Sequence, residues 1–140
     1  MSEDKGSLEN LRLEYSEANN NRRHYSNLRF AVLSVFFAVL GGVVSVAFGI
    51  VEIKSTSREN IVLWARVAGL LFTVIFFSFE ILCDLNLRHF GRVAKELEDL
   101  LGYRQFKTRQ FPLVPRAHYF TWSMYVLLII FWVFSICRRA

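Results

Sequence analysis

Three charged side chains recur at four-residue intervals beside one of the most apolar parts of the chain. Glu80, Asp84 and Arg88 share one face if this segment is a helix. Glu80 lies inside an apolar run, where an ionised group is costly unless it meets a partner, a cavity or an ion pathway. The chemistry that suits such a group is ion pairing, cation attraction or proton transfer.

Two interpretations of this charged face stay open. In the first, which we favour, Glu80 pairs with Arg88, or with Arg29 at the start of the first apolar run, and fixes the register of the helices. In the second, Glu80 and Asp84 from several copies form acidic rings at a pore mouth and favour cations. A proton relay is disfavoured, because no second intramembrane carboxylate or histidine accompanies Glu80.

Three apolar runs dominate the 140-residue chain, which is 54% hydrophobic. They cover residues 30–51, 61–83 and 118–137, and each has about the 20 residues needed to cross a bilayer. Too little polar surface remains to cover three such helices in a soluble protein. We therefore predict a single domain of the all-α membrane class with three transmembrane helices.

Helical spacing continues beyond the second run. Apolar residues recur at i, i+3, i+4 and i+7 through residues 84–102, and Gly102 provides a helix stop. Residues 1–28 are predicted to form an amphipathic helix, with Leu8, Leu11, Tyr15 and Ala18 on its apolar face. The two segments are expected to pair as an antiparallel cytoplasmic hairpin, or the stripe of 84–102 lies on the bilayer surface. Residues 103–117 form a connector.

Small residues line two of the predicted spans. Gly41, Ser45 and Gly49 are spaced four apart in the first span, and Ala65 and Gly69 repeat the pattern in the second. Such spacing lets membrane helices approach closely. We expect a tight helix pair, either within the chain or between copies, and hence a homo-oligomer.

The charge distribution predicts the orientation of the spans. Net charge is +5, and the Lys and Arg residues gather before the first run and after the second. Basic residues stay cytoplasmic, so the N-terminus is expected inside and the C-terminus outside. Arg138 and Arg139 oppose this, and a third segment that dips in without crossing is the alternative; its length favours crossing. Anionic lipid headgroups explain the basic excess better than nucleic acid does.

Enzymatic chemistry is not indicated. The sequence has no Ser-His-Asp context, no metal-ligand cluster and no Gly-rich phosphate loop, so we expect neither an enzyme nor a cofactor. Cys83 and Cys137 lie at the ends of different predicted spans and fit apolar filler better than a disulfide or a metal site.

Part of the chain resembles a family of small three-span bacterial inner-membrane proteins whose activity is uncharacterised. The matching residues are Phe76, Phe77, Phe79, Glu80, Leu97-Glu98, Leu101-Gly102, Gln105-Phe106 and Arg109. The chain departs from the family around Tyr103-Arg104, and it lacks the Arg that tends to follow the Glu. The resemblance implies a bacterial inner-membrane location and gives no activity. The layout is also similar, more distantly, to membrane effectors of bacterial defence systems, which are thought to oligomerise and permeabilise the membrane.

These observations lead to two functional expectations. The first is a non-enzymatic membrane protein that acts through helix assembly, as a homo-oligomeric pore-forming or membrane-perturbing effector. The second is a membrane scaffold or accessory subunit whose cytoplasmic helices dock a partner protein. Conductance in liposomes, or co-purification of a partner, distinguishes the two.

Overall fold

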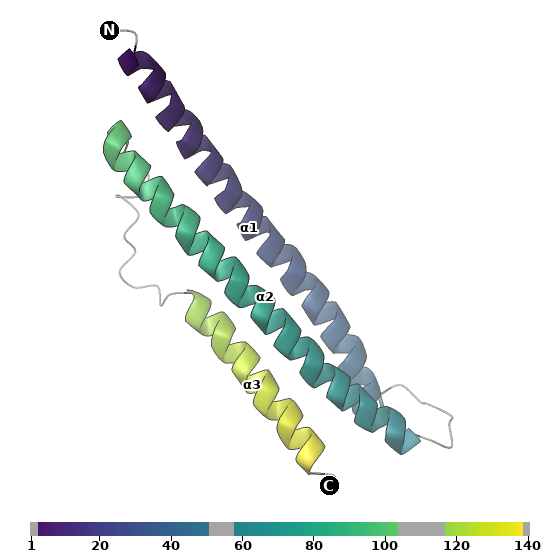
Figure 1. Ribbon diagram of the computed structural model, residues 1–140. Helices are drawn as coiled ribbons and strands as arrows, with labels where there is room; N and C mark the ends of the chain where they lie inside the picture. The colour runs from purple at the N-terminus through teal and green to yellow at the C-terminus, as the bar shows by residue number, and fades with distance from the viewer. Residues whose placement is uncertain (1–2, 51–57, 104–116, 139–140) are drawn as a thin grey trace. The chain divides into compact units, whose positions relative to one another are not determined.

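The computed structural model describes residues 3–50, 58–103 and 117–138. They form three helices, α1 (Glu3–Ala47), α2 (Arg58–Leu101) and α3 (Ala117–Cys137), and no strand occurs in these ranges (Figure 1). Each helix is long and apolar enough to cross a membrane. The prediction of an all-helical chain with three candidate membrane spans is therefore confirmed, and the chain is compatible with a multipass membrane protein.

The described residues divide into two compact units. Unit 1 contains residues 3–29 and 81–103, and unit 2 contains residues 30–50, 58–80 and 117–138. The helices α1 and α2 each contribute to both units, whereas α3 belongs to unit 2 alone. The predicted connector falls mainly on residues 104–116, outside the described residues.

Glycines with left-handed backbone conformations end the two long helices. Gly49 has a φ of 69°, and the amides of Gly49 and Ile50 donate to the carbonyls of Val46 (3.2 Å) and Ser45 (2.9 Å). This pair of hydrogen bonds is a Schellman motif, which satisfies the last carbonyls of α1. Gly102 has a φ of 71°, and the stop that the sequence predicts there is confirmed by the end of α2 at Leu101.

Unit 2 is held together by aromatic side chains from all three helices. The Tyr125 ring of α3 is 1% exposed and lies 5.0 Å from the Phe36 ring of α1 and 5.4 Å from the Phe77 ring of α2, centroid to centroid. Such pairs contribute about 0.5–1.5 kcal/mol each beyond the area they bury. In lipid, where apolar burial gives no net driving force between helices, this close packing is what holds a bundle together.

Unit 1 is an antiparallel pair made of the first part of α1 and the last part of α2 (Figure 1). The Tyr25 ring stacks on Phe90 at 5.7 Å, and Tyr15, more than two turns earlier, contacts Glu98, two turns later. Ala18, Ala94 and Leu97 are buried along this seam. Small side chains at the seam allow the two backbones to approach, as at other close helix contacts.

Candidate functional site

The two carboxylates of the charged face of α2 are buried, whereas Arg88 is exposed. Glu80 is 4% exposed and Asp84 is 6% exposed. Arg88, one turn beyond, places its Nη2 atom 2.5 Å from Asp84 Oδ2, an i, i+4 ion pair of the kind that the spacing favours. The structure pairs Arg88 with Asp84, and the pair of Arg88 with Glu80 stays a prediction.

Arg29 is the other basic residue that the sequence analysis assigned to Glu80. It lies on α1 and is half-buried. Arg29 belongs to unit 1 and Glu80 to unit 2, so their ion pair stays a prediction.

Gly69 is a small residue at which α2 and α3 approach each other closely. A Cβ atom added at Gly69 would lie 2.5 Å from Cζ2 of Trp132, whose side chain is fully buried. Thr73 Oγ1, also fully buried, donates to the Gly69 carbonyl at 2.7 Å. Ala65 is half-buried one turn before Gly69. Because Gly69 has no side chain, the Trp132 indole of α3 packs directly against the backbone of α2.

The small residues of α1 behave differently. Gly41 is exposed, and nothing described lies within 4 Å of a Cβ built on it, so this residue supports no close packing inside the chain. The Ser45 hydroxyl donates back to the Gly41 carbonyl at 2.8 Å. Gly49 lies beyond the end of α1 and acts as its cap, not as a helix-packing residue. Gly49 lies four residues after Ser45 because the helix ends there, and this spacing does not indicate a helix–helix contact.

The sequence analysis did not assign a role to Glu98, although the structure buries it completely. Its Oε1 atom accepts a hydrogen bond of 3.0 Å from the Tyr15 hydroxyl, which links the two helices of unit 1. Tyr15 also makes an edge-on contact with Tyr103, with ring centroids 5.5 Å apart. The sequence contains one indication that Glu98 is buried. It lies four residues after Ala94, which places it on the apolar side of the helix.

The environment of Tyr15 changes its acidity. Burial raises the pKa of the Tyr15 hydroxyl above its ordinary value of 10.0; a hydrogen bond with Asn19 lowers the pKa, and the bond to the Glu98 carboxylate raises it. Because folded Tyr15 keeps its proton to a higher pH than unfolded Tyr15, this residue's contribution to stability is complete below pH 10.0 and is lost as pH rises through the raised pKa.

We expect Tyr15 to titrate above the ordinary tyrosine pKa in the folded protein. The measurement is a pH titration of ¹³Cζ-labelled tyrosine by NMR in detergent micelles, with Tyr15→Phe to assign the resonance. Titration of that resonance at or below the value of a free tyrosine would contradict the burial of Tyr15 against Glu98.

No group of three His, Cys, Asp or Glu residues suited to a metal ion occurs within residues 3–50, 58–103 and 117–138. Cys83 is buried, Cys137 is exposed, and neither forms a disulfide within the described residues. Comparison with family models, with curated proteins and with solved structures finds no match to this chain.

Proposed function

We propose that this chain is a non-enzymatic multipass membrane protein that acts by assembling with copies of itself through α1. The observation that carries the proposal is an exposed face of small residues on α1, formed by Ala38, Gly41, Gly42 and Ser45. Ala38, Gly41 and Gly42 are exposed, and a Cβ added at either glycine would meet nothing within 4 Å. We name these four residues the small-residue face.

The small-residue face suits a second membrane helix better than it suits lipid. Glycines at three- and four-residue spacing let two helix backbones approach and form many van der Waals contacts, which are the main attraction between helices in a bilayer. The face lies within the apolar part of α1, which by length and composition can span a membrane. Within the chain, by contrast, the equivalent close approach is already made by Gly69 and Trp132.

The geometry favours assembly over an acidic pore. A ring of Glu80 and Asp84 at a pore mouth needs these carboxylates to face an open axis, whereas both are at least 94% buried in the single chain. In our proposal the assembly perturbs the membrane through packing of α1, and Glu80 has a structural role. By the positive-inside rule and the resemblance to bacterial inner-membrane proteins, we place unit 1 in the cytoplasm and the C-terminus outside.

Adding bulk at the small-residue face is expected to break the assembly. In lipid vesicles at low protein density, Gly41→Leu should weaken self-association by roughly tenfold, a loss of about 1.4 kcal/mol, because the helix backbones are held apart. Single-molecule photobleaching of labelled protein measures the number of copies per particle. Val133→Leu adds bulk at an exposed position of α3, outside the face, and should leave the count unchanged. Equal counts for Gly41→Leu and the parent chain would contradict the proposal.

A second candidate function, the scaffold, is supported by apolar residues exposed on unit 1. Leu100 is 70% exposed and Leu13 is 60% exposed, while Leu97 in the same helix is 6% exposed. Unlike the exposed residues of the candidate spans, these would face water if unit 1 lies in the cytoplasm. They offer contacts to a partner protein.

Two leucines of α2 test the scaffold separately from the fold. Leu100→Asp is expected to abolish co-purification of a partner while the helix content of the chain stays unchanged, because Leu100 is exposed. Leu97→Asp is expected to open unit 1 itself, since it places a charge in a buried seam. Circular dichroism and cross-linked pull-down report the two effects. Retention of the same partner by Leu100→Asp would exclude this surface as the docking site.

A further inference from the structure

Unit 2 contains a polar hollow where α1 ends and α2 begins. It has a volume of about 340 Å³ and is lined by residues that include Ala47, Gly49, Arg58, Glu59 and Arg66. A second hollow in unit 2, beside Val35 and Ile75, is almost wholly apolar. The hollow at the helix ends differs from this one because the guanidinium groups of Arg58 and Arg66 line it. We name it the arginine hollow.

The Arg66 guanidinium makes one hydrogen bond that holds it in place, and one of its other N–H groups has no acceptor among the described residues. Its Nη1 atom donates to the Ser135 carbonyl of α3 at 2.7 Å, and its Cζ atom lies 5.8 Å from the centre of the Phe48 ring. Its Nε atom is buried and finds no hydrogen-bond partner among the described residues. A buried charged donor without an acceptor is costly, so a negative charge in the hollow would stabilise the guanidinium group of Arg66.

Arg58 adds a second positive charge to the arginine hollow. Its Nη2 atom would lie only 2.9 Å from a Cβ atom at Gly49, so the side chain extends across the glycine that caps α1. Arg58 can stabilise the negative end of that helix. Glu59 lies in the first turn of α2, where a carboxylate complements the positive end of a helix. These local roles account for Arg58 and Glu59, and they leave Arg66 Nε without an acceptor.

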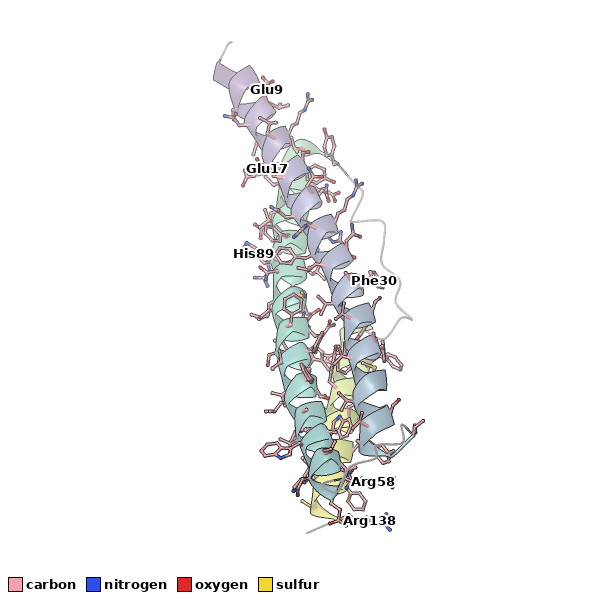
Figure 2. The ribbon with its side chains drawn as sticks, turned by 90° about the vertical axis from the view of Figure 1, so that its right-hand side faces the viewer. Glu9, Glu17, Phe30, Arg58, His89 and Arg138 are labelled. Carbon is pink, nitrogen blue, oxygen red and sulfur yellow. The ribbon has the colours of Figure 1, made fainter. Side chains whose placement is uncertain are left out.

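Arg138 increases the positive charge at the same end of unit 2. Figure 2 labels Arg58 and Arg138 at the same end of the helices. Glu59 is the one carboxylate among the residues named as lining the hollow, against the two guanidiniums of Arg58 and Arg66. The site is thus suited to an anion, and a planar guanidinium presents paired N–H donors that match the oxygens of a phosphate group.

We infer that the arginine hollow binds a phosphate group, which the guanidinium groups of Arg58 and Arg66 hold. The hollow lies at the end of the apolar parts of α1 and α2, which is the depth of lipid headgroups if these helices span a bilayer. The phosphodiester of an anionic lipid and free inorganic phosphate share this chemistry. Binding at this site concerns a different part of the chain from the small-residue face, so it does not depend on self-association.

Native mass spectrometry of the full chain in detergent tests the inference. With added phosphatidylglycerol, the parent chain should retain a lipid adduct, and Arg66→Gln should weaken its retention by about tenfold or more, the loss expected for a charge-assisted hydrogen bond. Arg58→Gln changes an exposed side chain, so it should fold normally and weaken the adduct as well. Arg92→Gln removes an exposed arginine of unit 1 and serves as the matched control.

Competition with inorganic phosphate distinguishes the two sources of the group. Loss of the lipid adduct at millimolar phosphate, with binding of phosphate itself, would identify the free anion as the ligand. Resistance of the adduct to phosphate, together with weaker retention of phosphatidylcholine, would identify an anionic lipid. Either result supports the inference. Unchanged phosphatidylglycerol retention in both Arg58→Gln and Arg66→Gln, or equal loss in Arg92→Gln, would overturn it.

Discussion

Gly69→Ala is expected to lower the free energy of unfolding of unit 2 by about 1–3 kcal/mol, the usual cost of overpacking a well-packed core. The added methyl group would lie 2.5 to 2.8 Å from three carbons of the Trp132 indole. The indole is fully buried, so it cannot move aside into lipid. Unfolding by SDS in mixed micelles, followed by tryptophan fluorescence, measures the loss.

The same substitution elsewhere in α2 is the control for this prediction. Gly91 lies in the same helix, and nothing is within 4 Å of a Cβ built on it. Gly91→Ala should therefore be neutral or stabilising by up to about 1 kcal/mol, because alanine loses less backbone entropy than glycine in a helix. In addition, Trp132→Leu should offset part of the effect of Gly69→Ala in the double variant. Purely additive losses would show that the two residues are not in contact.

Tyr15→Phe is expected to destabilise unit 1 by about 1.5–3 kcal/mol, the range for a hydrogen bond to a charged group. The substitution keeps the ring and removes the hydroxyl that donates to Glu98, whose side chain is fully buried. Amide hydrogen exchange of peptides from residues 8–25 and 85–101 measures the effect. Their exchange should accelerate by roughly 10- to 100-fold, since local opening governs the protection of such a pair.

Two further variants define the role of the Tyr15–Glu98 bond. Glu98→Gln keeps a carbonyl oxygen that can accept from Tyr15, so its effect should be smaller than that of Tyr15→Phe. Tyr103→Phe removes an exposed hydroxyl and keeps the ring that contacts Tyr15, so unit 1 should be unaffected. Equal exchange in Tyr15→Phe and Tyr103→Phe would show that the Tyr15–Glu98 hydrogen bond does not hold the helices together.

The number and type of the helices could be predicted from sequence because length and hydropathy are local properties. A run of about 20 apolar residues is sufficient to predict a span. The ends were less certain: the first predicted span extends to residue 51, whereas α1 ends at Ala47. Gly49 explains this difference, because its spacing is typical of packing while its φ of 69° makes it a cap.

The partners of individual residues could not be predicted in the same way. The spacing of Gly41, Ser45 and Gly69 marks them as small positions, but the contact of Gly69 with Trp132 joins residues far apart in the sequence. Likewise, the sequence analysis drew attention to Glu80 because it interrupts an apolar run. It passed over Glu98, whose neighbours include Glu96 and Asp99, because a carboxylate among charges looks like a solvated face. Burial depends on the packed helix pair, which sequence spacing alone does not specify.

The central claim is that two copies of the chain meet at the small-residue face of α1. Disulfide cross-linking in lipid vesicles tests it most directly, with single cysteines placed along α1 in a chain that carries Cys83→Ala and Cys137→Ser. We predict efficient cross-links at Ala38, Gly41 and Ser45, and weak ones at Leu40 and Val43, which are half-buried and lie on the other side of the helix. Equal efficiency at all five positions, or no cross-link at Ala38, Gly41 and Ser45, would contradict the account.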